Sequence, residues 1–228
     1  MSSAVYEQRR AVLEAYFDRT AFEAWSRLTS DAPLGRIRAT VRAGRDRMRA
    51  TLLDWLPADL SGCRVLDAGC GTGSLSVEAA RRGADVLAID LSPTLLDLAR
   101  TRLPAGLRGS VRFQPGDMLD ASHGRFDHVV AMDSLIHYPA REMAGAVAAL
   151  AARSRGAVLF TFAPRTPALS VMHTVGRVFP RGDRAPAIEP VSARKITRLL
   201  RASGLTTART QRIASGFYTS QALEVLVS

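Results

Sequence analysis

Apolar and polar positions follow two different rhythms along the chain, and the change comes near residue 57. Before it, the segment 37–55 repeats apolar or small residues at spacings of three and four, the period of one helix face. These positions are Ile37, Val41, Gly44, Met48, Leu52 and Trp55. Pro57 follows closely and is typical of a helix end. We therefore expect residues 1–57 to be helical, and we assign them as an N-terminal lid, a role that periodicity by itself does not show.

Beyond residue 57, short apolar runs alternate with amphipathic segments. Strands are expected at 63–68, 85–90, 111–115, 126–132, 156–162, 206–213 and 217–227. Helices are expected at Ser74–Arg82, Pro93–Leu103, Ala140–Arg153 and Ala193–Ala202, with Ser92 and Ser192 as N-caps and with Gly83 and Gly204 at helix ends. This alternation is typical of an α/β fold with a mostly parallel sheet and helices on both faces. Since no helix separates the last two runs, they should form an antiparallel hairpin, and 58–228 should form one domain.

The segment 163–190 interrupts this alternation. It holds five of the eleven prolines and is longer than an ordinary connection between a strand and a helix. Its apolar residues include Leu169, Met172, Val175 and Phe179. We expect an inserted helix or flap that covers a ligand on the substrate side of the domain.

The composition fits an ordinary globular protein with a sizeable core, since 47% of the 228 residues are hydrophobic and 23% are charged. The N-terminus has no apolar leader, and the longest small-apolar run, 143–152, is shorter than the roughly 20 residues that span a bilayer. We expect a cytoplasmic protein, with peripheral membrane contact left open. The two cysteines, Cys63 and Cys70, argue against a disulfide framework or a structural zinc site, and no metal site is predicted.

The formal charge of +10 is unevenly distributed. Residues 1–150 hold 19 basic and 18 acidic side chains, whereas 151–228 hold 12 basic and 3 acidic ones. An anion would therefore be drawn to the last third of the chain; the alternative is solubility and a general preference for arginine. A separate arginine stripe follows the helical segment, and a solvated face is favoured for it over recognition of an anion. Its members are Arg38, Arg42, Arg45 and Arg49.

The sequence VLDAGCGTGS, residues 65–74, follows the first predicted strand and places glycines at alternate positions. A turn from a strand into a helix that lacks side chains lets backbone N–H groups approach a ligand beyond the carboxyl ends of the strands. A dinucleotide fingerprint would need its third glycine at position 74, which is Ser74. The loop is instead G-x-G-x-G, preceded by Asp67.

In these residues the chain resembles the class I S-adenosylmethionine-dependent methyltransferases. The resemblance implies a Rossmann-like fold with a seven-stranded sheet and S-adenosylmethionine as cofactor, whose methionine part the glycines make room for. It implies that Asp90 takes the ribose hydroxyls and that Asp117 contacts the adenine amino group. It also implies that Asp133 opens the loop nearest the transferred methyl. The expected cofactor-binding set is Asp67, Gly69, Gly71, Gly73, Asp90, Leu91, Asp117, Met118 and Asp133.

Over nearly its whole length the chain also resembles one family, the magnesium-protoporphyrin IX O-methyltransferases of chlorophyll and bacteriochlorophyll synthesis. The segments that carry this are YFDRTAFEAW (16–25), IRATVRAGR (37–45), DAGCGTGSLS (67–76), DSLIHYP (133–139), FAPRTP (162–167) with GRVFP after it, and GFYTSQALE (216–224). The resemblance implies methyl transfer to one propionate carboxylate of magnesium protoporphyrin IX, giving the monomethyl ester. It further implies catalytic roles for His137 and Tyr16, a partnership with the large subunit of magnesium chelatase, and peripheral association with photosynthetic membranes.

The residues themselves leave alternatives open. Tyr16 can be a packing residue of its helix, and His137 can make a structural hydrogen bond. After the fourth predicted strand the chain reads DSLIHY instead of the N-P-P-Y type sequence of many enzymes that methylate nucleobase amino groups, so no nucleic-acid substrate is expected. The alternative functions are an O-methyltransferase for another hydrophobic carboxylic acid or phenol, a basic RNA-binding methyltransferase-like protein, and a non-catalytic subunit of a pigment-synthesis complex.

Overall fold

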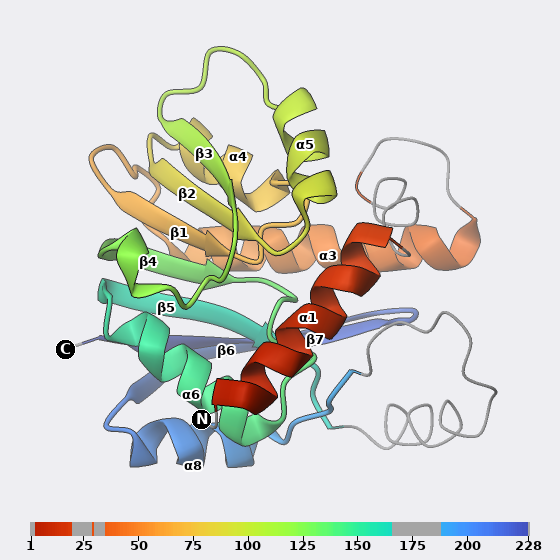
Figure 1. Cartoon of the computed structure of the whole chain (residues 1–228), viewed down its shortest axis with the longest axis vertical. Helices are drawn as coiled ribbons and strands as arrows, with labels where there is room; N and C mark the ends of the chain where they lie inside the picture. The colour runs from red at the N-terminus through yellow and green to blue at the C-terminus, as the bar shows by residue number, and fades with distance from the viewer. Residues whose placement is uncertain (1–2, 20–28, 30–34, 166–187, 228) are drawn as a thin grey trace.

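The structure, a computed structural model, describes residues 3–19, 29, 35–165 and 188–227. Its helices surround one central sheet (Figure 1). The helices are α1 Ser3–Arg19, α3 Arg36–Trp55, α4 Ser74–Arg81, α5 Pro93–Thr101, α6 Ala140–Ala151 and α8 Ala193–Ala202, with a short 3₁₀ turn at Ala121–His123. The strands are β1 Arg64–Ala68, β2 Asp85–Asp90, β3 Ser110–Pro115, β4 Phe126–Ala131, β5 Ser154–Phe162, β6 Thr206–Ser215 and β7 Tyr218–Leu226.

The described strands form a seven-stranded sheet in the order β3-β2-β1-β4-β5-β7-β6. Neighbouring strands from β3 to β5 pair in parallel, whereas β7 runs antiparallel to both β5 and β6. The predicted α/β fold, its mostly parallel sheet and its C-terminal hairpin are therefore confirmed. Each predicted strand and helix of the domain is present, and α8 has the predicted bounds.

The helix-end predictions have mixed outcomes. Ser92 caps α5, because its hydroxyl oxygen accepts a hydrogen bond from the N–H of Leu95 at 3.2 Å. Gly83 and Gly204 have φ angles of +100° and +78°, the left-handed backbone expected after a helix. Ser192 stands at the N-cap of α8, but its side chain makes no capping hydrogen bond. The position was predicted correctly, and the interaction was not.

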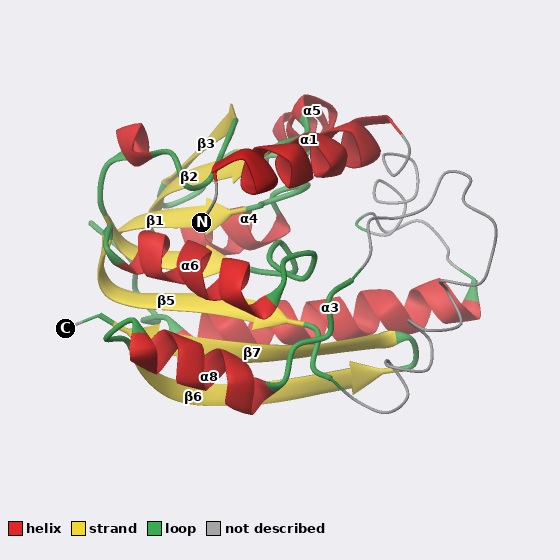
Figure 2. Cartoon of the chain, turned by 60° about the horizontal axis from the view of Figure 1, so that its bottom comes forward, coloured by secondary structure: helices red, strands yellow, loops and turns green. Residues whose placement is uncertain are grey.

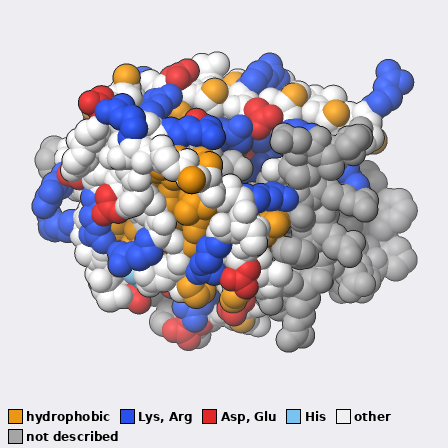
Figure 3. All heavy atoms as spheres, turned by 90° about the horizontal axis from the view of Figure 1, so that it is seen from above, with side chains coloured by type: hydrophobic (Ala, Val, Ile, Leu, Met, Phe, Trp, Pro, Cys, Tyr) orange, Lys and Arg blue, Asp and Glu red, His pale blue; other side chains and the backbone are white. Residues whose placement is uncertain are grey.

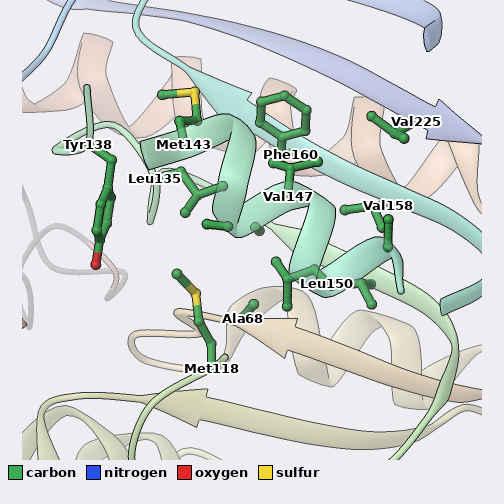
Figure 4. Packing of buried hydrophobic residues seen from close by; sticks show 14 of the residues in the cluster. Ala68, Met118, Leu135, Tyr138, Met143, Val147, Leu150, Val158, Phe160 and Val225 are labelled. Atoms are coloured by element: carbon green, nitrogen blue, oxygen red, sulfur yellow. The ribbon is translucent and has the colours of Figure 1, made fainter. Parts of the chain in front are cut away.

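Helices cover both faces of the sheet, as Figure 2 shows. On one face α6 and α8 share a core cluster with the strands, and Leu13 of α1 joins this cluster. Figure 4 shows Met143 and Val147 of α6 beside Phe160 of β5. On the other face α3, α4 and α5 share a second cluster with the opposite side of the same strands. Because successive side chains of a strand point to opposite faces of the sheet, each central strand contributes residues to both clusters.

The order in which successive strands are added to the sheet reverses between β1 and β4. β1 pairs with β2 on one side and β4 on the other, so the chain leaves β1 for α4 on one face and leaves β4 for α6 on the other face. This arrangement opens a space beyond the carboxyl ends of the two strands, which is where ligands of such sheets bind.

Helix α3 packs along the sheet and extends past it. Met48 and Leu52 are buried among the strands as the periodicity predicts, whereas Ile37 is 58% exposed because the first turns of α3 reach beyond the strands (Figure 2). Gly44 permits the close approach: a Cβ there would lie 2.5 Å from the ring of Tyr218. That residues 1–57 act as a lid over 58–228 stays a prediction.

The predicted insert begins and ends next to the β4 loop. Arg165 N–H donates to the Val191 carbonyl at 3.0 Å, and Glu189 N–H donates to the Ile136 carbonyl at 2.8 Å. Between them, 166–187 lies outside the described residues, as do 20–28 and 30–34 of the expected lid. No helix in the described part of the chain is long and apolar enough to cross a membrane.

Candidate active site

A cavity of about 280 Å³ lies at the carboxyl ends of the central strands. The loops after β1, β2, β3 and β4 form one side of it, and α1 and α3 contribute the other. The predicted site residues that line it are Asp67, Gly69, Gly71, Asp90, Leu91, Asp117, Met118, Asp133 and His137. Gly73 and Tyr16 are not among the lining residues. The structure thus brings together most of a set that the sequence spreads over 70 positions.

The three glycines of the first loop have different reasons to lack a side chain. All have positive φ angles, between +55° and +83°. A Cβ at Gly69 would lie 2.3 Å from the Ser134 Cβ, and one at Gly73 would lie 2.7 Å from the Phe113 ring. A Cβ at Gly71 would meet nothing within 4 Å. The missing side chains of Gly69 and Gly73 therefore admit protein atoms, and Gly71 is the position at which the loop leaves space for a ligand.

Asp90 holds this loop from the end of β2. Its carboxylate accepts hydrogen bonds from the N–H of Gly71 at 2.7 Å and from the N–H of Ser92 at 3.0 Å. Burial raises the pKa of Asp90, and these backbone donors act in the opposite direction. The acid predicted to face a ribose therefore also connects the glycine loop to the start of α5.

Asp67 lies deeper, at 2% exposure. The Ser76 hydroxyl donates to its carboxylate at 2.5 Å. Burial raises the pKa of Asp67 to about 7, with the nearby Asp90 adding to the rise and the Ser76 hydrogen bond opposing it. Asp67 therefore keeps its proton to a higher pH than an exposed carboxyl group does. Its hydrogen bond joins β1 to α4 beneath the glycine loop.

Helix α1 is attached to the loops that follow β3 and β4 (Figure 1). Arg10 pairs with Asp117 at 3.3 Å, and Arg9 donates both to Glu142 and to the carbonyl of His137 at 3.1 Å. The other carboxylate oxygen of Asp117 accepts from the N–H of Leu119 at 2.8 Å. Asp117, which is predicted to bind the adenine amino group, thus also binds α1 through Arg10.

Asp133 is the centre of a hydrogen-bond network. Its φ of +55° makes it the non-glycine residue with positive φ in the described part of the chain. Arg45 pairs with its carboxylate at 2.7 Å, and the Tyr218 hydroxyl lies 3.1 Å from both oxygens. Ser220 and Thr161 donate to the same group at 3.3 and 3.1 Å. Asp133 lines the cavity, but protein donors occupy its carboxylate.

The arginine stripe of α3 does not form the solvated face that periodicity favoured. Arg42, Arg45 and Arg49 line the cavity, whereas Arg38 is exposed. Asp46, also in the cavity wall, pairs with Arg49 at 2.9 Å. The interpretation was wrong because the period of a helix shows which residues share a face and not what that face meets. Recognition of an anion was the alternative that the sequence left open for these arginines, and they were not among the predicted site residues.

The two predicted catalytic residues lie in different surroundings. His137 is 7% exposed and lines the cavity from the β4 loop. Tyr16 is half-buried on α1, and burial raises the pKa of its hydroxyl. His137 thus reaches the cavity, whereas Tyr16 is not among its lining residues. Among the described residues, no group of three or more His, Cys, Asp and Glu side chains could hold a metal ion.

The two ends of the cavity carry different groups. Asp117, Asp90 and Asp67 lie after β3, after β2 and in β1, whereas Arg45 lies on the other side, where it pairs with Asp133 after β4. Arg49, a further cavity residue of the same helix, pairs with Asp46. Such a site suits an elongated ligand with hydroxyl or amino donors at one end and an anionic group at the other.

Comparison with known proteins points in the same direction. Residues 131–227 match the family model described as magnesium-protoporphyrin IX methyltransferase C-terminus, and residues 65–155 match a methyltransferase domain model. The chain is 50% identical over 220 residues to the magnesium-protoporphyrin O-methyltransferase of Rhodobacter capsulatus, which covers 96% of this chain and 97% of the relative. It is 31% identical over 232 residues to that of Synechocystis sp., with 100% of each chain covered.

A solved structure is similar over the same length. The crystal structure of magnesium protoporphyrin IX methyltransferase from Synechocystis PCC 6803 with bound SAH superposes with a TM-score of 0.86 at 30% sequence identity. The match covers 96% of this chain and 100% of that chain.

Proposed function

The chain belongs to the family of magnesium-protoporphyrin O-methyltransferases, and we propose that it transfers the methyl group of S-adenosylmethionine to a propionate carboxylate of magnesium protoporphyrin IX, giving the monomethyl ester. The observation that carries this proposal is the cavity at the carboxyl ends of β1 and β4, with Asp90 and Asp117 at one end and the paired arginines of α3 at the other. When bound, S-adenosylmethionine supplies an electrophilic methyl group on a positively charged sulfur.

The residues present fit this cofactor. Gly71 leaves space where a Cβ would project and donates its N–H to Asp90, and the buried Met118 lines the same cavity. We assign the ribose hydroxyls to Asp90, beside Leu91, and the adenine to Asp117 and Met118. Asp67 lies beneath the glycine loop and supports it through Ser76. Gly73 supports the loop by its contact with Phe113, although it does not line the cavity.

The acceptor needs little help from acid–base groups. A propionate titrates near the glutamate reference of about 4.3, so it is ionised at neutral pH and is already a nucleophile. The protein then contributes by aligning the reacting atoms and excluding water. We assign to His137, buried in the cavity wall, a role in orienting the acceptor. A role for Tyr16 rests on the family resemblance and on its place in α1.

Incubation with S-adenosylmethionine and magnesium protoporphyrin IX tests the proposal. The expected product is the monomethyl ester, identified by its mass and chromatographic retention. Magnesium protoporphyrin dimethyl ester, which has no free carboxylate, is the matched control and should accept nothing. Equal rates on unrelated small acids or phenols would contradict the assignment, and absence of turnover with intact cofactor binding would favour a non-catalytic subunit.

An RNA-binding function has less support. On the face seen in Figure 3, basic side chains lie among acidic, hydrophobic and uncharged ones. Non-specific RNA binding depends on a basic track and is strongly salt-dependent. An RNA affinity that fell steeply with salt at micromolar protein would revive this alternative.

Peripheral membrane contact is a second part of the proposal. Phe217, at the tip of the β6–β7 hairpin, is 61% exposed, and Ile37 of α3 is similarly exposed. The two lie at one end of the molecule, because a Cβ at Gly216 would touch the Thr40 side chain. Co-sedimentation with anionic phospholipid vesicles should fall when both are changed to Ser.

Binding to the large subunit of magnesium chelatase rests on the family resemblance, and co-purification with that subunit tests it.

A further inference from the structure

Arg45 is anchored on the side of the cavity that lies away from the expected nucleoside. Asp117, Asp90 and the glycine loop follow β3, β2 and β1 in the order of the sheet. The partners of the Arg45 network come from the strands beyond: Asp133 follows β4, Thr161 is in β5, and Tyr218 is in β7. Neighbouring strands lie about 4.8 Å apart, and β4 is two strands from β2 and three from β3, so Asp133 lies next to the glycine loop and away from Asp90 and Asp117.

The arginines of α3 also extend over more length than one carboxylate occupies. Arg42, Arg45 and Arg49 line the cavity, and with a rise of 1.5 Å per residue they span roughly 10 Å of the helix. Arg49 has Asp46 as a partner on the same helix, whereas Arg45 is tied to the loop that carries His137. Among these three arginines, Arg45 is therefore the one that is attached to the loop after β4, where we expect the acceptor to bind.

We propose that Arg45, held in place by Asp133, docks the carboxylate that accepts the methyl group, and that Tyr218 is a positioning residue that acts on Arg45 through Asp133. This inference rests on the proposed function and assigns a residue to its acceptor side. The left-handed backbone of Asp133 supports it, because strain at a site is retained where the surrounding structure requires one geometry.

The chemistry explains why a paired arginine suits this position. In the reaction a bond forms between a carboxylate oxygen and the methyl carbon, the bond between methyl carbon and sulfur breaks, and its electron pair stays on the sulfur. No proton moves, and an anion and a cation become two neutral groups. An unpaired arginine would stabilise the anionic ground state more than the transition state, which lowers kcat. The carboxylate of Asp133 offsets part of the Arg45 charge, so the acceptor is oriented without losing its nucleophilicity.

The first test separates binding from turnover. Arg45→Met should raise the KM for magnesium protoporphyrin by about 10- to 100-fold, the range of one charge-assisted hydrogen-bonded pair, while kcat and the affinity for S-adenosylhomocysteine change less than threefold. The KM of Arg45→Lys should lie between those of wild type and Arg45→Met, because lysine keeps the positive charge but lacks the bidentate donors of the guanidinium. Arg38→Met, an exposed arginine of the same helix, is the matched control and should behave as wild type.

Asp133→Asn gives the sharper result. It keeps the shape of the side chain but removes the charge that offsets Arg45, so the KM for the acceptor and kcat should both fall. A merely structural role would lower kcat without tightening acceptor binding.

Arg45→Met leaves a buried carboxylate without its cation, which destabilises the fold. The Arg45→Met/Asp133→Asn variant is therefore measured as well. It should show the same high KM as Arg45→Met but a higher thermal stability than that variant.

A double-mutant cycle tests Tyr218. Tyr218→Phe should raise KM in the wild-type background and have no further effect on KM in the Arg45→Met background, since both act through one carboxylate. Additive effects would overturn its positioning role.

Two outcomes separate this inference from the proposed function. If wild type forms the ester and Arg45→Met weakens S-adenosylhomocysteine binding instead of acceptor binding, Arg45 serves the cofactor and the inference is wrong. If wild type forms no ester, the proposed function fails. Fluorescence-quenching affinities for magnesium protoporphyrin and its dimethyl ester then decide the inference, which requires that Arg45→Met abolish any preference for the free acid.

Discussion

The backbone N–H of Gly71 donates a hydrogen bond to the carboxylate of Asp90 across 2.7 Å, so the glycine loop after β1 and the acid after β2 form one unit. Asp90 accepts from Ser92 as well, and it lines the cavity beside the open space at Gly71. A ligand that occupies this space would contact a loop whose shape the acid already maintains.

Asp90→Ala should weaken binding of S-adenosylhomocysteine. Loss of hydrogen bonds to a charged acceptor costs about 1.5–3 kcal/mol, or roughly a 10- to 100-fold rise in the dissociation constant by calorimetry. Asp97→Ala, an exposed acid on α5 that pairs only with its helix neighbour Arg100 in the contacts described, is the control and should bind normally. Unchanged affinity in Asp90→Ala would refute the ribose assignment.

Alanine substitutions at Gly69 and Gly71 should have different effects, one mainly on the thermal stability of the protein and the other mainly on ligand binding. Alanine in a left-handed conformation costs about 1–2 kcal/mol at either position. Gly69→Ala additionally drives a Cβ into Ser134, whereas Gly71→Ala places its methyl in the cavity. Thermal melting should therefore show the lower midpoint for Gly69→Ala, and S-adenosylhomocysteine titration should show the larger loss for Gly71→Ala. The reverse order would remove Gly71 from the cofactor site.

Asp67 should make stability depend on pH. Burial raises its pKa from 3.8 to about 7 in the folded protein. Between those values the folded protein holds a proton that the unfolded chain has lost, so the free energy of unfolding falls as pH rises and levels off above pH 7. Asp67→Asn keeps an acceptor for Ser76 and removes this slope. Urea unfolding at pH 5 and pH 8 should show a smaller difference for Asp67→Asn, and equal differences would count against the raised pKa.

Leu13 should control how long the cofactor stays bound. It is 4% exposed, belongs to the core cluster under α1 and lines the cavity, whereas its neighbour Val12 is 57% exposed. Leu13→Ala removes the apolar anchor of α1, so stopped-flow measurements should show faster dissociation of S-adenosylhomocysteine. Val12→Ala removes a similar side-chain volume on the outer face of α1, and S-adenosylhomocysteine should dissociate from it at the wild-type rate. Equal rates in both variants would argue against α1 as a lid.

His137 should matter for turnover more than for cofactor binding. Its contact with Arg9 uses the backbone carbonyl, so His137→Ala leaves the attachment of α1 in place. We expect kcat to fall by about 100-fold, the cost of misplacing the reacting atoms by about 1 Å, with an unchanged dissociation constant for S-adenosylhomocysteine. Wild-type kcat in His137→Ala would exclude it from the reaction, and Tyr16→Phe measured in parallel tests the second assignment.

Local sequence patterns determined the elements and the ligand end of the site. The short apolar runs and the helix-end signals are local, and they placed every strand of the sheet and the bounds of α8 without reference to the rest of the chain. The glycine loop and the acids at strand ends could be located for a related reason: parallel strands bring their carboxyl ends to one edge, so Asp67, Asp90 and Asp117 had to meet there.

Tertiary structure decided what each of these side chains contacts. Arg45 and Asp133 are 88 residues apart in the chain and 2.7 Å apart in the fold, and no periodicity of α3 could reveal that its arginine face meets the β4 loop. The same holds for Asp133, whose place after a strand was evident but whose carboxylate is taken up by Tyr218, Ser220 and Thr161 from two other strands. Sequence spacing fixes which residues share a face, because that is local geometry; the partner of the face depends on how distant elements pack around a common core.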